Sequence, residues 1–268
     1  MRFYIPIKKG KKQMVDMSQI KTISDYAFNC MFSNNSSIKG LVDLSNLTTV
    51  GKWGLEGSFD NCDNITSVDL SKLTNVGFYG LLNAFSYCDN LTSVDLSALT
   101  NLTGDSAGDQ FYYAFSNCIN LTSVDLSSLT SVVARQAFYF TFEGCKNLIS
   151  VDLSSLQIVN DNSPFNYTFT GCIKLPSFTF PKLTTVGYQA FACCFRNCTS
   201  LKLISFPALT STSFGSYTNQ FYMMLQGVTG CTVHFPSNLQ SIIGSWSDVT
   251  SGFSGTNTTV LFDLPATY

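Results

Sequence analysis

The sequence repeats one aspartate at a fixed place in a recurring phrase, and this row of carboxylates is the first candidate for chemistry. The five residues are Asp43, Asp69, Asp95, Asp125 and Asp152. If the repeats stack, neighbouring carboxylates lie about 5 Å apart and repel by roughly 1 kcal/mol in water, so cations or a basic partner would stabilise them. A flat row does not surround Ca²⁺ with the roughly six to eight oxygens that it prefers. The alternative to a binding role is that aspartate is merely tolerated at this solvent-facing position, where repeat duplication copied it and neighbouring Ser residues form hydrogen bonds with it.

Aromatic residues in the more variable stretches form a second candidate, a surface that binds a protein or a sugar. They recur at similar places in successive repeats, and the candidate patch consists of Tyr79, Tyr112, Tyr113, Tyr139 and Tyr188. The alternative is that many of these rings belong to the core on the convex side of the fold. Both interpretations remain open from the sequence.

Ten cysteines suggest a disulfide framework or a metal site. Six of them share one repeat position, where cysteine commonly packs as a small hydrophobic residue, although stacked neighbours would be close enough to bridge. We expect free, buried thiols. Zinc binding is not expected, because the tightest cluster is Cys193, Cys194 and Cys198, no C-x-x-C is present, and His234 is the single histidine.

Catalytic groups are scarce in this sequence. His234 is the one histidine that could act as a base, and the two glutamates, Glu56 and Glu143, have no matching acid in the repeat register. The sequence contains no G-x-S-x-G and no Gly-rich phosphate loop with its lysine. We therefore predict a protein that is not an enzyme and that uses no cofactor and no metal.

The candidate residues owe their spacing to an internal repeat of 26 to 30 residues, written roughly F-x-x-C-x-N-L-T-S-V-D-L-S-x-L-T-x-V. Phe and Cys recur three residues apart, at Phe59/Cys62, Phe85/Cys88, Phe115/Cys118, Phe142/Cys145, Phe169/Cys172 and Phe195/Cys198. A Leu or Phe follows each of these Cys residues by eight positions. Length varies only between these phrases, which is typical of loops on one side of a stacked coil.

Each repeat predicts one rung, meaning one turn of such a coil. Apolar and polar residues alternate in L-T-S-V-D-L, so Val94 and Leu96 should face the core while Ser93 and Asp95 face solvent. A second short extended piece begins at Leu99. No single repeat buries its inward face alone, so the rungs must stack. We predict a repeat solenoid with a parallel β-sheet, built mostly from strands and loops with short helical turns.

A family resemblance follows from the same phrase. The pattern C-x-x-L-x-x-V-x-L-S/P-x-L-x-x-V followed by A-F, seen from Cys88 to Phe115, resembles the BspA-like class of bacterial leucine-rich repeats. Later repeats place Pro181, Pro207 and Pro236 after the strand, as that class does. The resemblance covers about residues 22–265. It implies a leucine-rich-repeat right-handed coil and a role in cell-surface adhesion and host-protein binding, without a shared active site.

The ends of the chain differ from the repeats. Residues 1–21 form a basic N-terminal arm or cap with six basic residues and one acidic residue, residues 22–236 contain about eight rungs, and residues 237–268 form a C-terminal cap. The rest of the chain is acidic and has no basic stripe, so we expect no nucleic-acid binding. No apolar run is long enough to span a bilayer, and the apolar stretch at 3–7 is too short for a secretory signal.

Two functions fit these features. The first is a non-enzymatic recognition or adhesion protein that presents a rigid surface to a protein or glycan partner on a cell surface or in the extracellular space. The second is a structural component of a phage virion or another large particle, docked through the basic arm, for which no signal peptide is needed. Only 12% of the residues are charged, while Ser, Thr and Asn are abundant, so either function would use a polar but weakly ionic surface.

Overall fold

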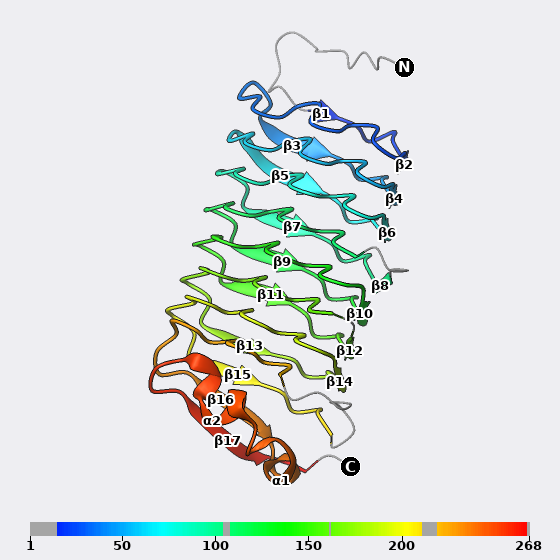
Figure 1. The fold of residues 1–268 in the computed structure, drawn as a ribbon. Helices are drawn as coiled ribbons and strands as arrows, with labels where there is room; N and C mark the ends of the chain where they lie inside the picture. Colours follow the sequence, from blue (N-terminus) through cyan, green and yellow to red (C-terminus); the bar gives the residue numbers. More distant parts are fainter. Residues whose placement is uncertain (1–14, 104–107, 161, 211–218, 267–268) are drawn as a thin grey trace.

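The computed structural model describes residues 15–103, 108–160, 162–210 and 219–266. Figure 1 shows a stack of similar rungs that runs from β1 at one end to β17 at the other. Within these residues, ten strands follow one another along one face of the stack, and seven strands of two or three residues follow one another along a second face. The architecture is a parallel β-solenoid, as the repeat predicts.

The first face begins with a six-stranded parallel sheet. It contains β1 (Val15–Asp16), β3 (Gly40–Asp43), β5 (Ile65–Asp69), β7 (Ser93–Asp95), β9 (Ser123–Asp125) and β11 (Ser150–Asp152). The alternation expected in the repeat phrase is present: Val94 is buried, whereas Ser93 and Asp95 are exposed. Each strand therefore contributes apolar side chains to the core and polar side chains to the outer surface.

A second sheet continues this face. It contains β13 (Ser177–Thr179), β15 (Leu203–Ser205), β16 (Thr232–Pro236) and β17 (Thr259–Leu264). Before the break, Thr122 donates its backbone N–H to Thr92 O at 2.9 Å, and Ile149 donates to Thr122 O at 3.0 Å. The next rung has Pro176 at this position. Because proline has no N–H, it cannot continue the series, and the sheet is interrupted there.

Two further sheets form the second face of the stack. One contains β2 (Thr22–Ile23), β4 (Thr49–Val50) and β6 (Asn75–Val76), and the other contains β8 (Asn101–Thr103), β10 (Ser131–Val133), β12 (Ile158–Val159) and β14 (Thr185–Val186). The sequence predicts a second extended piece that begins at Leu99; the strand there, β8, begins two residues later at Asn101, and Leu102 is its buried residue.

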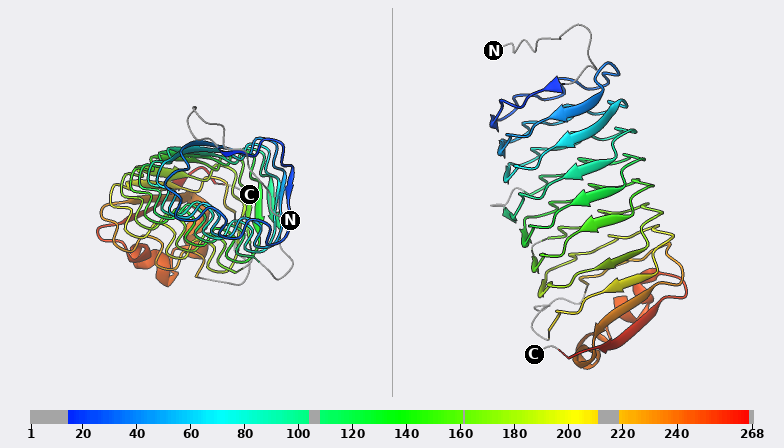
Figure 2. Two further views of the ribbon diagram at one scale, coloured as in Figure 1. Left: turned by 90° about the horizontal axis from the view of Figure 1, so that it is seen from above. Right: turned by 180° about the vertical axis from the view of Figure 1, so that it is seen from behind.

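The core runs the length of the solenoid as columns of identical residues. The phenylalanines of the F-x-x-C phrase are fully buried and stack on one another with ring centroids 5.1 to 5.8 Å apart: Phe59, Phe85, Phe115, Phe142, Phe169 and Phe195. Their separation follows the spacing of hydrogen-bonded rungs. The view along the stack in Figure 2 shows the rungs surrounding this interior.

The side opposite the first face consists of consecutive turns with a period of four residues. In one rung, φ is +61° at Asp109, +53° at Tyr113 and +58° at Asn117. Backbone N–H groups alternate between two kinds of acceptor: Tyr113 donates to Tyr139 O of the next rung at 3.0 Å, and Ala114 donates to Phe111 O of its own rung at 3.0 Å. These turns satisfy the backbone without a helix.

The last rung contains the helical elements, which are η1 (Ser237–Leu239), α1 (Gln240–Ile243), α2 (Ser247–Thr250) and η2 (Gly252–Ser254). β17 follows them and pairs in parallel with β16. At the other end, the part of the basic arm that the structure describes includes β1, which pairs with β3. No helix in the described residues is long and apolar enough to cross a membrane.

Candidate binding surfaces

The five predicted aspartates lie side by side on adjacent strands, and we call this row the Asp column. The strand register pairs Asp43 with Asp69, Asp69 with Asp95, Asp95 with Asp125, and Asp125 with Asp152. The backbone of β1 continues the same register to Asp16. The sequence therefore predicts the alignment of these residues correctly.

Each carboxylate in the Asp column also closes a local turn at the end of its strand. Its Oδ1 accepts a hydrogen bond from the backbone N–H of the serine two residues later, at 2.9 to 3.1 Å. The Ser71 hydroxyl donates to the same oxygen of Asp69 at 2.7 Å. Aspartate favours such turns because its short side chain reaches the backbone two residues on. This local role is sufficient to explain why aspartate recurs there.

A shallow hollow of about 600 Å³ lies over β7, β9 and β11. Its polar lining consists of Ser93, Asp95, Ser123, Asp125, Ser150 and Asp152. Val94 and Val124 lie between them with their side chains buried. Within the described residues, no group of three or more His, Cys, Asp or Glu side chains is placed to hold a metal ion. The hollow thus offers a row of hydroxyl and carboxylate oxygens rather than a metal cage.

A second surface consists of nine aromatic rings that follow one another over six successive rungs. We call this surface the aromatic band, and its rings belong to Tyr26, Trp53, Phe78, Tyr79, Tyr112, Tyr113, Tyr139, Phe140 and Tyr167. Successive rings in the band have centroids 4.2 to 5.8 Å apart. Every ring is at least partly exposed, and Tyr26 at the end of the band is 59% exposed.

The turns of the rungs determine how these rings are arranged. Tyr113, Phe140 and Tyr167 occupy the same positive-φ position in three successive rungs. Their rings stack, with centroids 4.9 Å apart and an interplanar angle of 1° for the first pair, and 4.6 Å and 16° for the second. Tyr112 and Tyr139 stack beside them at 4.9 Å. The regular spacing of the rungs therefore places the rings at stacking distance.

A buried carboxyl group lies beside the aromatic band. Asp109 is 7% exposed, its Oδ1 is buried with no hydrogen-bond partner among the described residues, and the Tyr79 phenol and the positive charge of Arg135 act on the carboxyl group. Burial raises the pKa of Asp109, and Arg135 and Tyr79 oppose this shift. Burial, followed by the negative charge of Glu143, raises the pKa of Tyr113 to about 12. The Tyr113 phenol is therefore a neutral hydrogen-bond donor at physiological pH.

Comparison with protein families identifies the repeat. The family described as "BspA type Leucine rich repeat region" matches in six copies, over residues 11–139, 58–194, 110–217 and 140–246. The chain belongs to this family. BspA-type repeat proteins are generally non-catalytic, and leucine-rich-repeat surface proteins generally bind proteins. The coarse functional class of this chain is therefore a binding repeat protein.

Three solved structures that are similar to this chain are bacterial proteins. The pneumococcal vaccine antigen PcpA is 14% identical, with a TM-score of 0.36 over 92% of this chain and 78% of that chain. A leucine-rich cell surface protein from Faecalibacterium prausnitzii is 16% identical, with a TM-score of 0.32 over 88% and 62%. A leucine-rich repeat protein from Bacteroides ovatus is 16% identical, with a TM-score of 0.23 over 92% and 83%. No curated protein matches the sequence.

The structure places the tyrosines of the predicted patch in two groups. Tyr79, Tyr112, Tyr113 and Tyr139 lie in the aromatic band. Tyr188 lies on the rung after Tyr167, where it is half-buried and its carbonyl accepts the Ser163 N–H at 3.1 Å. Sequence reasoning missed Tyr26 and Trp53. A signal for Trp53 was present, because V-G-x-W-G around it matches V-G-x-Y-G around Tyr79.

The repeated cysteines of this BspA-type chain are inward-facing and chemically shielded. In the described rungs, the thiols of Cys88, Cys118, Cys145 and Cys172 each donate to a phenylalanine carbonyl of another rung at 3.1 to 3.2 Å. Burial raises the pKa of all four thiols. All ten cysteines are free, and Cys30 is the exposed one. A neutral buried thiol is a poor nucleophile.

His234 lies on β16, and its Nδ1 is 2.7 Å from Asp263 Oδ1 on β17. The pair joins the last two strands on their outer face. A carboxylate at Nδ1 orients a histidine as in a catalytic triad, in which Nε2 contacts the nucleophile. Among the described residues, the side-chain contact found for His234 is the one to Asp263. We assign this pair a structural role in the last rung.

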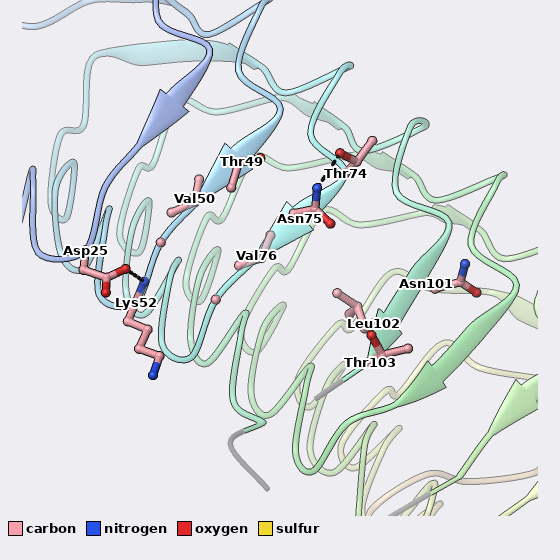
Figure 3. Close-up of a pocket in the computed structure, with 12 residues that line it drawn as sticks. Asp25, Thr49, Val50, Lys52, Thr74, Asn75, Val76, Asn101, Leu102 and Thr103 are labelled. Atoms are coloured by element: carbon pink, nitrogen blue, oxygen red, sulfur yellow. Dashed lines mark hydrogen bonds between the residues drawn. The ribbon is translucent and has the colours of Figure 1, made fainter. Parts of the chain in front are cut away.

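A second hollow, of about 340 Å³, lies where β6 ends one sheet and β8 begins the next. Figure 3 shows Asn75 and Asn101 on its two sides, with Asp25 and Lys52 at one end. Asp25 Oδ1 accepts the backbone N–H of Lys52 at 2.8 Å. None of the described residues that line this hollow is a histidine, cysteine or glutamate. Its groups can form hydrogen bonds with a ligand but do not form a catalytic set.

Proposed function

We propose that this chain is a non-enzymatic recognition protein that binds a protein partner on a cell surface, and that the aromatic band is its contact surface. The observation that carries this proposal is the continuity of nine partly exposed rings over six rungs. Large exposed aromatic patches are uncommon on proteins that bind nothing. Tyr and Trp are also the residues that contribute most to protein interfaces.

The chemistry of the aromatic band suits a protein partner. Each tyrosine offers apolar area together with one hydroxyl donor, which is the combination enriched at the centre of interfaces. The stacked rings are already ordered by one another and by the rungs, so little side-chain entropy is lost on binding. Arg135 is exposed beside the band and Asp109 is buried under it. Glu143 and Arg196 also act on the band, through Tyr113 and Tyr167. The nine rings are thus accompanied by four ionisable groups, a low proportion of the kind found at the centre of interfaces.

The Asp column is a weaker candidate for the contact surface. Its carboxylates already accept hydrogen bonds that close local turns, so their recurrence needs no partner. The alternative function, docking to a virion or another particle, depends on the basic arm. Residues 1–14 of that arm lie outside the described residues, and no observation on the rest of the chain favours docking.

The test compares two variants in binding to intact mammalian epithelial cells. Tyr112 and Tyr139 lie at the centre of the aromatic band, and neither has a positive φ. Tyr222 occupies the same repeat position three rungs beyond Tyr139, is 44% exposed, and lies outside the band. We expect the double variant Tyr112→Ser/Tyr139→Ser to bind about tenfold or more weakly, and Tyr222→Ser to bind as the unmodified protein does.

Treatment of the cells identifies the class of partner. A protein partner predicts saturable binding of the labelled chain that trypsin treatment of the cells abolishes and periodate oxidation of their sugars does not. Binding that resists trypsin and is abolished by periodate would mean a glycan partner and would overturn the proposal. Absence of saturable binding, or equal losses in the double variant and in Tyr222→Ser, would also overturn it.

A further inference from the structure

Rungs on the second face are joined at a recurring point, where several donors of one rung share a carbonyl oxygen of the rung before it. At β6, Thr48 O accepts the N–H groups of Thr74 and Asn75, both at 3.0 Å, and the Thr74 hydroxyl at 3.2 Å. In a later rung, Gln157 O accepts the Thr184 N–H at 2.8 Å and the Thr184 hydroxyl at 3.2 Å. These rungs therefore present donors that are arranged for a single oxygen atom.

This junction is missing between β6 and β8, beside the hollow of about 340 Å³ that Thr74 and Asn101 line. By the pattern of the neighbouring rungs, Thr74 O would accept the N–H groups of Thr100 and Asn101 and the Thr100 hydroxyl. Within the described part of the chain, Thr74 O accepts no hydrogen bond and none of these three donors has an acceptor. The side chains of all three residues are exposed. An open place for one oxygen atom is therefore accessible from solvent.

The width of the gap limits what can enter it. The same two rungs are still joined on either side of the gap, by the register of Val68 with Val94 on the first face and by Leu81 N–H to Gln110 O at 3.0 Å on the opposite side. A peptide strand between β6 and β8 would need two strand spacings, about 9.6 Å, and rungs joined at both sides do not open so far. A single group that both accepts and donates needs less room, and a hydroxyl is such a group.

We propose that this hollow is a binding site for a neutral sugar, with one sugar hydroxyl at the open junction. That hydroxyl accepts hydrogen bonds from Thr100 and Asn101 and donates its own hydrogen to Thr74 O. Asn75 and Thr103 also line the hollow, and their side chains can bond to neighbouring hydroxyls of the same ring. Figure 3 shows Asn75 and Asn101 on the two sides of the site.

The charge and the size of the hollow also favour a neutral sugar. Among the described residues that line it, the charged ones are Asp25 and Lys52, whose opposite charges favour an ion of neither sign. A volume of about 340 Å³ lies at the lower end of the range for small-molecule sites, which suits a monosaccharide unit. Solvent-exposed hydrogen bonds contribute little each, so we expect a Kd of about 1 mM or weaker. So weak a site does not hold the chain on a cell by itself, and the proposal does not rest on the aromatic band.

The test follows the backbone amide signals of the full chain by NMR while methyl glycosides of glucose, galactose, mannose and N-acetylglucosamine are added to about 20 mM. With at least one glycoside, the Thr100 and Asn101 signals should shift and saturate, because their N–H groups gain an acceptor. The Thr184 and Thr185 signals should not shift, because these N–H groups already donate to Gln157 O. Glycerol offers hydroxyls without a sugar ring, and it should cause no saturable shift.

Two valine variants at the same repeat position give a matched comparison. Thr100→Val removes a hydroxyl that donates to no described residue, so the fold should be kept while the affinity for the glycoside falls by about fivefold. Thr184→Val removes a hydroxyl that donates to Gln157 O, away from the hollow, and should leave the affinity unchanged. Circular dichroism checks that both variants are folded.

Four results would each overturn the proposal. The first is that no glycoside causes a saturable shift, which would mean that the junction holds only water. The second is that glycerol causes the same shifts as the glycosides. The third is that the shifts centre on Tyr112 and Tyr139 in the aromatic band instead of on Thr100 and Asn101. The fourth is that Thr100→Val and Thr184→Val lose affinity equally.

Discussion

Replacing Asp95 by Asn is expected to stabilise the fold, because it removes repulsion within the Asp column. Strand pairing places Asp69 and Asp125 on either side of Asp95, about 4.8 Å away. Each neighbour repels Asp95 by about 0.9 kcal/mol in water and by about 0.5 kcal/mol after screening at physiological salt. Asn keeps the oxygen that accepts the Ser97 N–H. The expected gain in the free energy of unfolding is therefore about 1 kcal/mol at physiological salt.

Asp152 provides the internal control for this prediction. It ends the column, because the sheet is interrupted after β11 and Asp125 is its one paired neighbour within the described strands. Asp152→Asn should therefore gain about half as much, near 0.5 kcal/mol. Urea denaturation of the three proteins at low salt and at high salt measures both gains. The reasoning is refuted if Asp95→Asn loses stability, if the two gains are equal, or if high salt leaves them unchanged.

Three further predictions follow from the core and from the buried acid. Phe142→Ala should lower the free energy of unfolding by about 3–5 kcal/mol, since the Phe142 ring is fully buried between two stacked neighbours; a loss below about 1 kcal/mol in urea denaturation would contradict this. Ellman's reagent should modify one thiol of the native protein, Cys30, and all ten after denaturation; rapid native modification of several thiols would contradict their burial. Asp109 has a raised pKa in the folded state because of burial, so stability should fall as pH rises from its unfolded pKa through its folded pKa. Asp109→Asn should therefore raise the melting temperature at pH 7 but not at a pH below the ordinary value of 3.8, and an equal effect at both pH values would show that its charge is not the cause.

Most of the first face could be predicted from the sequence, because its determinants are local and repeated. The alternation around Val94 fixes which side chains face the core, and the phrase S-V-D that recurs in neighbouring repeats fixes the register of their strands, although the repeat length varies. Even the break between the two sheets has a sequence cause in Pro176, which lacks the N–H that its counterparts donate. The effect of Pro176 was not predicted, because a single proline indicates a break in the sheet only when it is known that the backbone N–H at that position donates a hydrogen bond to the preceding rung.

The turns of the opposite side could not be predicted in the same way. Asn34, Asn61 and Asn117 have positive φ, which suits asparagine, and their recurrence was a usable signal. Trp53, Phe140 and other bulky residues have the same backbone conformation, although local propensity disfavours it. Hydrogen bonds to the next rung decide the conformation there, such as Trp53 N–H to Phe78 O at 3.0 Å. Such contacts depend on the stacking of rungs, so no single repeat predicts them.

The strained backbone positions also indicate for which rings of the aromatic band the stability of the fold is a sufficient reason for an aromatic residue. A bulky residue at positive φ destabilises the folded state by roughly 1–2 kcal/mol, and each aromatic contact stabilises it by about 0.5–1.5 kcal/mol. Phe140 contacts Tyr113, Tyr139 and Tyr167, so its contacts offset its strain without any binding partner. Tyr26 has φ of +56°, stacks on Trp53 alone among the described rings, and is 59% exposed. Its contact barely offsets its strain, so the exposed end of the band at Tyr26 is where a role in binding accounts best for the choice of residue.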